Sequence, residues 1–459
     1  MPEVKAPDRT VGFGEKLFWT GIVLVVYLIM TEIPLFGVRT SGTTDPFFYM
    51  RMIFASARGT LMELGIQPIV TSGMILQLLA GSGVINVDFS NTDDRAIFSS
   101  ATKFFSLLMT GFLAIVYLGG GYYGQISLPI SIVIFLQLMF AGALIILLDE
   151  LLQKGWGIGS GMSLFIAAGV SQRIIWNIFC PIPDLRAGGD QMSWGALIAY
   201  IQLLLSGANP LNSFITRSLP DAPTMLGLLA TIAVFVIVIY LQGLRVEIPI
   251  SHARFRGFRG RHPVKFFYVS NIPVILVTSL FMDIYFVSQI ITSRFNPDGT
   301  NFFLNLLGRF DGGTPIGGLS YYITAPTTFT AFLADPLRGL IYALLMILCS
   351  VIFSVIWVEV GGLGPDAVAK QLVDAGMQIP GFRRSQRTIK QILERYISTV
   401  TILGALTVGA IAAVANFFGV FGTGMGVLLT VGILYQYYEI LVKEQLMSTY
   451  PMLGRVFGE

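Results

Sequence analysis

The chain has 459 residues, of which 54% are hydrophobic and 12% are charged. Soluble domains carry about 25% charged residues, so the composition excludes an ordinary soluble protein. The two cysteines lie beside apolar stretches, which disfavours a disulfide framework or a cysteine metal site. The two histidines lie in one basic segment and form no HExxH motif. We therefore expect an integral membrane protein that is not an enzyme, with no catalytic residue, metal or cofactor.

Ten mostly apolar stretches are candidates for helices that cross a hydrocarbon core of ~30 Å. They cover 17–33, 66–79, 104–118, 128–148, 158–179, 225–244, 269–291, 340–358, 397–417 and 427–442. The pattern predicts an all-α polytopic membrane protein with ten transmembrane helices.

The distribution of Lys and Arg predicts which side of the membrane is cytosolic. The N-terminus, the even-numbered loops and the C-terminal tail hold 20 of these residues, and the odd-numbered loops hold 9. Loops rich in Lys and Arg stay on the cytosolic side. Both termini are therefore predicted to be cytosolic.

Ten spans divide into two sets of five. We predict an N-terminal half at 1–185, an external linker at 186–222 and a C-terminal half at 223–459. An odd number of spans in each half gives the two halves opposite orientations. Inverted repeats of this kind occur in transporters whose path follows the interface between the repeats, so a central pore is expected between the halves.

One segment, at 47–64, has a helical composition but is too short to cross the membrane, and it carries Arg58 and Glu63. Apolar segments of about 10–14 residues are typical of re-entrant or interfacial elements. Backbone that does not span the membrane is tolerated at that depth only inside protein or beside water. We therefore predict a short re-entrant helix at about 50–65.

Two long cytosolic loops, at 245–265 and 359–395, together contain twelve Lys and Arg residues. One interpretation is that these charges only orient the protein and contact lipid headgroups. A topology signal needs only a few charges, however, and basic clusters of this size bind anionic partners such as RNA. A cytosolic docking surface is the alternative that the loop length favours.

Six segments match one known family in order and at its spacing. They read GTLMELGIQPIVTSG at 59–73, LDELLQKG at 148–155, GIGSG at 157–161, RVEIPI at 245–250, YVSNIPVIL at 268–276 and GMGVLLT at 424–430. Over essentially its whole length, the chain resembles the SecY/Sec translocon α-subunit family of protein-conducting channels. The resemblance implies a pore that conducts unfolded secretory polypeptides across the membrane and releases transmembrane segments laterally into lipid.

The resemblance also implies partners and a cellular location. The family works as a heterotrimer with a SecE/γ subunit and a small β subunit, and it handles signal sequences and nascent chains delivered by a translating ribosome or another cytosolic driver. Residues 45–51 and 61–64 resemble eukaryotic members, whereas residues 165–172 and the short C-terminal tail resemble archaeal ones. We favour an archaeal-type SecY in the cell membrane; a eukaryotic source would place the chain in the endoplasmic reticulum membrane.

By motif match, the resemblance assigns roles to individual residues. The ring that closes the pore would consist of Ile66, Val70, Met162, Ile166, Ile275 and Leu429. The plug would include Arg58, Gly59, Thr60, Leu61 and Leu64. The lateral gate would include Thr71 and Asn271, with Leu113 at a position where the family commonly has a polar residue. Ribosome docking would fall to Arg254, Arg256, Arg383 and Arg384.

Without the resemblance, the ring residues would be interpreted as ordinary core or lipid-facing side chains. Thr71 and Asn271 would be interpreted as interhelical hydrogen-bonding residues, worth about 0.6 kcal/mol each. The glycine clusters at 155–161 and 422–426 follow no strand, so they predict tight helix starts rather than a nucleotide site. The ring has a clear physical use, because an aliphatic constriction dewets and stops ions without binding any particular side chain.

Two other classes of membrane protein are disfavoured. A secondary transporter needs titratable or ion-binding residues near mid-membrane, and Asp283 is the only carboxylate well inside a predicted span. An intramembrane protease needs a catalytic group, and no histidine or aspartate pair lies inside a predicted span. A peptide-gated ion conductance, rather than solute counterflow, would distinguish a protein channel from both.

Overall fold

The fold is taken from a computed structural model of the chain. It describes all residues except 1, 2, 10, 39–50, 52, 53, 82, 83, 86, 88–91, 120–122, 124, 125, 184–191, 208, 210–213, 216, 218–221, 253–258, 270, 271, 297, 298, 312, 313, 327, 375, 379–384 and 450–459.

Each predicted span corresponds to one helix. These helices are α1 (Phe13–Glu32), α3 (Gln67–Gly81), α4 (Thr92–Gly119), α5 (Leu128–Leu151), α6 (Gly161–Phe179), α9 (Met225–Gly243), α10 (Ile272–Phe295), α14 (Pro336–Val360), α16 (Gln386–Phe417) and α17 (Gly424–Thr449). Among the described residues, nine helices are long and apolar enough to cross a membrane; α3, which corresponds to the remaining predicted span, has only 15 residues. The all-helical polytopic fold is therefore confirmed.

Two helices begin well before their apolar stretch. The helix α4 starts at Thr92 rather than near residue 104. Asp93 and Asp94 in its first turn stabilise this start, because their negative charges interact favourably with the positive end of the helix dipole. The helix α16 starts at Gln386 rather than near residue 397, because Ile389 and Leu393 bury one face of the extension. Hydropathy locates the membrane-crossing part of a helix, and it misses polar turns that project beyond it.

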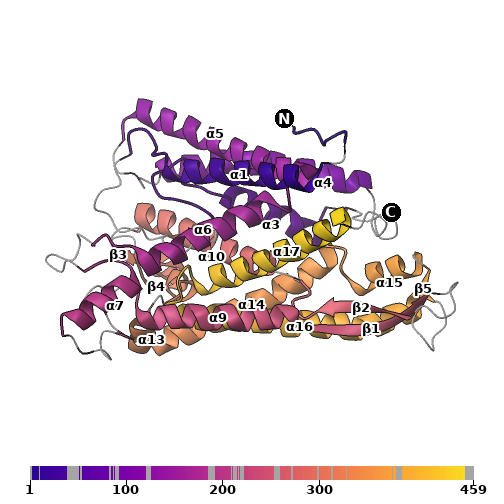
Figure 1. The fold of residues 1–459 in the computed structure, drawn as a ribbon. Helices are drawn as coiled ribbons and strands as arrows, with labels where there is room; N and C mark the ends of the chain where they lie inside the picture. The colour runs from indigo at the N-terminus through magenta and orange to yellow at the C-terminus, as the bar shows by residue number, and fades with distance from the viewer. Residues whose placement is uncertain are drawn as a thin grey trace.

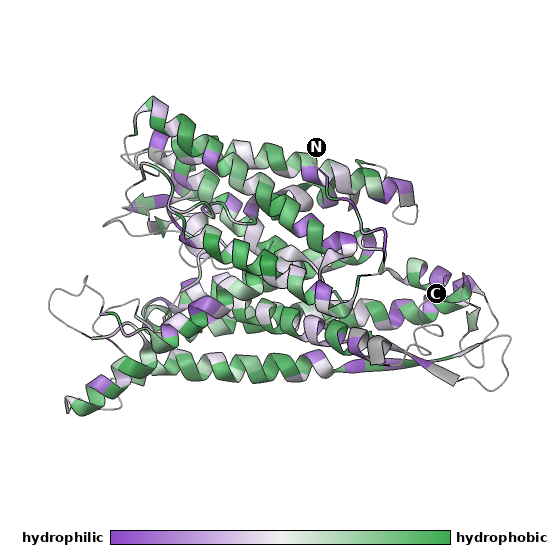
Figure 2. Ribbon diagram, turned by 45° about the horizontal axis from the view of Figure 1, so that its top comes forward, coloured by the Kyte–Doolittle hydropathy of each residue, from purple (hydrophilic) through white to green (hydrophobic). Residues whose placement is uncertain are grey.

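The long helices form a bundle with three parts (Figure 1). The helices α1, α4 and α5 lie on one side, α9, α14 and α16 on the other, and α3, α6, α10 and α17 between them. Contacts of α3 with α4 join the middle helices to one side, and contacts of α10 with α14 and of α17 with α9 join them to the other. Apolar residues continue onto the outer surface of the helices (Figure 2), where Phe140 and Leu344 are more than half exposed, as expected for side chains that face lipid.

Short elements cover one end of the bundle (Figure 1). They are α7 (Ala196–Leu205), α11 (Phe302–Leu307), β3 (Arg309–Asp311), β4 (Thr314–Gly317), α12 (Leu319–Ile323) and α13 (Phe329–Ala334). The helix α7 lies within the predicted external linker, where no element was predicted from the sequence.

The other end of the bundle carries a small sheet built from both basic loops (Figure 1). The strands β1 (Arg245–His252) and β2 (Arg259–Lys265) form an antiparallel hairpin, and β5 (Met377–Gln378) pairs with the end of β1. The helix α15 (Pro365–Asp374) packs against α16 beside the sheet. Ile248 and Val264 of the hairpin share a second hydrophobic core with α14, α15 and α16, so the two loops form one structural unit.

Arg51 of the predicted re-entrant segment is helical, and residues 54–66 after it form mainly turns and bends. Ala55, Gly59 and Gly65 have positive φ angles of 51°, 72° and 54°. A right-handed helix needs negative φ at every residue, so these positions interrupt it. A Cβ on Gly65 would lie 2.1 Å from the carbonyl oxygen of Phe54, which leaves room only for glycine.

Candidate functional site: an aliphatic cluster, a folded segment and a polar seam

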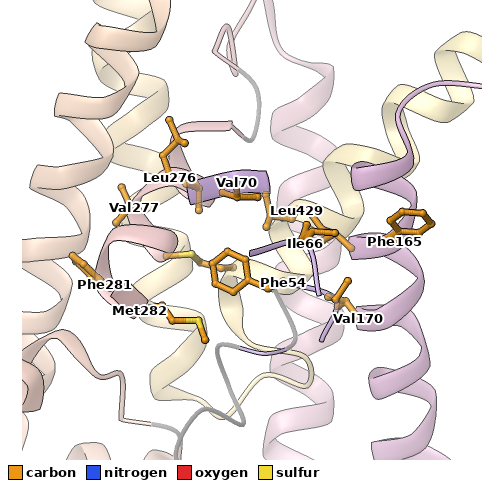
Figure 3. Close-up of a cluster of buried hydrophobic side chains, with 14 of the residues drawn as sticks. Phe54, Ile66, Val70, Phe165, Val170, Leu276, Val277, Phe281, Met282 and Leu429 are labelled. Carbon is orange, nitrogen blue, oxygen red and sulfur yellow. The ribbon is translucent and has the colours of Figure 1, made fainter. Parts of the chain in front are cut away.

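The centre of the bundle contains a cluster of aliphatic side chains contributed by different helices. Ile66 and Val70, at the start of α3, lie beside Leu429 of α17 (Figure 3). Ile66 and Leu429 are fully buried and Val70 is 9% exposed. These three predicted ring residues are therefore brought together at the heart of the protein.

The other predicted ring residues belong to the same core. Ile166 of α6 is buried, whereas Met162 of α6 and Ile275 of α10 are partly buried and pack against the cluster. The neighbouring Leu276 lies close to Val70 in Figure 3 and is 6% exposed. The sequence does not predict Leu276 as a ring residue. In an apolar helix, the rotation about the helix axis decides whether Ile275 or Leu276 faces the cluster, and the sequence does not determine that rotation.

The turns at 54–66 fill the space next to this cluster. Phe54 is fully buried and lies beside Ile66 (Figure 3). The backbone of the segment is fixed to the end of α1, because the amide of Leu35 donates to the carbonyl of Gly59 at 2.8 Å and the amide of Leu61 donates to the carbonyl of Ile33 at 3.0 Å. The segment therefore occupies the centre without crossing it.

A buried ion pair holds the turns together. Arg51 and Glu63 approach to 2.6 Å, with side chains 3% and 0% exposed, and the amide of Gly59 donates to the same carboxylate. Isolated buried charges are strongly disfavoured unless they are paired. Of the predicted plug residues, Leu64 is buried, whereas Arg58, Thr60 and Leu61 are half-buried.

A polar contact joins α3 to α10 across the middle of the bundle. Thr71 of α3 is within 3.0 Å of the Ser279 hydroxyl and donates to Asp283 at 3.3 Å. Gln67 of α3 also donates to Asp283, at 3.3 Å. We call Gln67, Thr71, Ser279 and Asp283 the polar seam.

The polar seam differs in part from the predicted gate. Thr71 belongs to it, whereas Asn271 lies outside the described residues. Leu113 of α4 is buried, at 3% exposed. Gln67, Ser279 and Asp283 were not predicted to act together, although Asp283 stood out as a carboxylate inside a span.

The described part of the chain contains no group of three or more His, Cys, Asp or Glu side chains that could hold a metal ion. The site thus consists of a buried aliphatic cluster, a folded segment beside it and a polar seam between α3 and α10.

Comparisons with known proteins identify the family. The SecY family model matches residues 60–438, and the model for the plug domain of Sec61p matches residues 25–59. The chain belongs to the SecY family. This SecY-family chain is a multi-pass membrane protein and the protein-conducting channel subunit of the Sec61/SecY translocon, a transporter rather than an enzyme.

Individual relatives agree over nearly the full length. The chain is 44% identical to the protein transport protein Sec61 subunit alpha of Dictyostelium discoideum, covering 97% of this chain and 94% of the relative. A solved protein-conducting channel matches with a TM-score of 0.82 and 38% identity, covering 97% and 96% of the two chains. Sec61 in the canine ribosome–channel complex from the endoplasmic reticulum matches with a TM-score of 0.79, 38% identity and the same coverage.

The predicted docking residues of the SecY-family chain, Arg254, Arg256, Arg383 and Arg384, lie outside the described residues. The elements on either side of them are described. The hydroxyl of Tyr268, next to the hairpin, donates to the carbonyl of Leu363 at 2.7 Å, and burial raises the pKa of Tyr268 to about 12. This hydrogen bond links the chain just after the hairpin to the second basic loop.

Proposed function

We propose that the aliphatic cluster is the seal of the resting channel and closes around a passing polypeptide. The observation that carries this proposal is that Ile66, directly before α3, Val70 of α3 and Leu429 of α17 are buried beside one another. Aliphatic side chains exclude water and ions from a narrow pore. They also lack directional partners, so they fit polypeptides of any sequence.

The experiment that tests this function uses the translocon in proteoliposomes. An unfolded secretory precursor should become protected from added protease in wild-type vesicles. Replacement of Ile66, Ile166 and Ile275 with Asn should preserve this protection while making the vesicles leak ions before precursor is added. A triple variant that is as ion-tight as wild type would overturn the ring assignment.

We also propose that residues 50–65 are the plug of the resting channel. The segment carries its own buried ion pair and is attached to α1 through backbone hydrogen bonds. It can therefore move as a unit when a polypeptide enters, without the loss of a spanning helix. Arg58, Gly59, Thr60, Leu61 and Leu64 belong to this unit.

The polar seam supports a lateral gate between α3 and α10. In the closed channel its polar groups satisfy one another, whereas separation of the helices toward lipid would leave them without partners. Signal sequences and transmembrane segments would leave the pore here. Thr71 and Asp283 carry this proposal, and Asn271, the residue directly before α10, is proposed as a further gate residue.

The cytosolic sheet supports a single docking surface for a translating ribosome. Ser251 and His252 of β1 pair with Gln378 and Met377 of β5, so the described residues that directly precede 253–258 and 379–384 belong to one sheet. Guanidinium groups form bidentate hydrogen bonds with phosphate and stack on bases. We therefore assign contacts with ribosomal RNA to Arg254, Arg256, Arg383 and Arg384. Two relatives were solved in ribosome complexes, the canine Sec61 channel and the yeast Ssh1 complex, the latter at 26% identity with a TM-score of 0.79.

The proposed assembly is a heterotrimer with a SecE/γ subunit and a small β subunit, in which the halves 1–185 and 223–459 have opposite orientations around the pore. The five-plus-five order of the spanning helices supports this division. Co-purification of the full chain from its native membrane tests the assembly, and recovery of the chain without small subunits would contradict it.

We further propose an archaeal-type SecY in the cell membrane with both termini cytosolic. The support is the sequence at 165–172, set against 44% identity to a eukaryotic Sec61 subunit alpha. Accessibility of terminal tags in intact cells of the source tests the placement. Tags confined to endoplasmic reticulum membranes would overturn it.

A further inference from the structure

The loop at 157–161, between α5 and α6, is fastened to three other helices. The amide of Ile158 donates to the Thr20 hydroxyl of α1 at 2.9 Å. The Tyr437 hydroxyl of α17 donates to the carbonyl of Ser160 at 3.1 Å. The carboxylate of Asp149, near the end of α5, accepts from the Ser160 hydroxyl at 3.4 Å.

Asp149 caps the helix that carries two of the ring residues. Ser160 occupies the N-cap position of α6 but makes no side-chain cap hydrogen bond. The amide of Met162 instead donates to Oδ1 of Asp149 at 3.1 Å. Gln153 donates to Oδ2 at 2.8 Å, so the buried carboxylate is fixed from both sides. A cap supplied by the preceding helix ties the start of α6 to α5.

The glycines of the loop permit these close approaches. A Cβ on Gly161 would lie 2.7 Å from Cα of Asp149, and a Cβ on Gly159 would lie 3.0 Å from the ring of Tyr437. The φ of Gly159 is +72°, which disfavours other residues. The motif GIGSG therefore brings α5 and α17 into direct contact with the first residues of α6.

We propose that Asp149 and Tyr437 are positioning residues that hold the ring side chains of α6 at the same depth along the pore axis as Leu429 of α17. This inference rests on the proposed function of the aliphatic ring. The capped amide belongs to Met162, which is itself a ring residue, and Ile166 follows one helical turn later. Tyr437 and Leu429 are eight residues apart on α17, about 12 Å along a helix. A shift at the start of α6 therefore changes the height of its ring residues relative to Leu429.

The experiment compares variants of the full translocon in planar bilayers and by amide hydrogen exchange. Asp149→Ala removes the cap, and we expect faster amide exchange at Met162. The resting conductance should rise about fivefold, because the loss of an N-cap costs about 1 kcal/mol, which corresponds to about a factor of five in the closed-to-open ratio. Asp149→Asn keeps an oxygen acceptor and should remain near wild type. Tyr437→Phe keeps the aromatic ring and removes only the hydroxyl, so it should leak less than Asp149→Ala but more than wild type.

Asp335→Ala is the matched control, because Asp335 caps α14 through the amide of Arg338 at 3.1 Å and α14 carries no ring residue. It should leave the conductance unchanged. Leu429→Asn tests the ring itself. If Leu429→Asn leaks while Asp149→Ala and Tyr437→Phe do not, the positioning role is overturned and the ring stands. If Leu429→Asn is ion-tight, the ring proposal fails, and the positioning role fails with it.

Discussion

The substitution Leu429→Asn tests the seal at its most buried member. Leu429 is fully buried among aliphatic side chains in the closed channel. An amide without a hydrogen-bond partner at such a position costs about 1–3 kcal/mol in proteins. When the pore is open the amide meets water, so the cost applies to the closed state only.

A shift of about 2 kcal/mol changes the closed-to-open ratio about 30-fold, because 1.4 kcal/mol corresponds to a factor of ten. We therefore expect a resting conductance about 30-fold above wild type in planar bilayers, with little change in the amount of assembled translocon. Leu434→Asn is the matched control, since Leu434 lies on the same helix and is 48% exposed. Equal conductance in the two variants would refute the reasoning.

Three further predictions concern the plug, the polar seam and the docking surface. Deletion of residues 57–64 should raise the resting conductance without changing topology, and a span lost in protease mapping would show that the segment is not a plug. Asp283→Leu removes two hydrogen bonds to α3, each worth about 0.6 kcal/mol. The gate should then open more easily, and a model transmembrane segment should need about two fewer leucines to integrate into the membrane. An unchanged leucine requirement in a glycosylation-based integration assay would contradict the gate. Charge reversal at Arg256 and Arg383 to Glu should weaken ribosome co-sedimentation severely at low salt and make the remaining binding less salt-dependent, while topology stays intact; wild-type-like binding would leave these arginines only an orienting role.

The spanning helices could be predicted from the sequence because lipid imposes a minimum length and an apolar composition on each of them. The short helix α3 was found as well, although its 15 residues make it the weakest signal. Composition alone did not reveal the turns at 54–66, where positive φ at Ala55, Gly59 and Gly65 overrides the helical propensity of the neighbouring residues.

The cytosolic strands were missed for a different reason. Pro249 and Pro263 lie within the hairpin, and proline argues against a central strand. Both are accommodated because β2 is an edge strand and β5 pairs with β1 only at Ser251 and His252. Pairing between segments more than a hundred residues apart leaves no local signal.

The polar seam could be predicted only in part. Thr71 was identified, but the partners of Asp283 depend on the rotation of α3 against α10, which the sequence of either helix does not determine. The cap at Asp149 was missed likewise, since a helix is normally capped by the residue directly before it. In both cases the missing information is a tertiary contact between helices.

The central claim is that polypeptides cross this SecY-family chain through the aliphatic ring, and site-specific disulfide cross-linking tests it most directly. In a background with Cys180→Ser and Cys349→Ser, a secretory chain arrested midway and carrying one cysteine is offered to Ile66→Cys, Leu429→Cys or Phe140→Cys. Phe140 is 64% exposed on the outer surface of α5. We predict cross-links at Ile66→Cys and Leu429→Cys and none at Phe140→Cys. Cross-links at Phe140→Cys without any at the two ring positions would contradict the account.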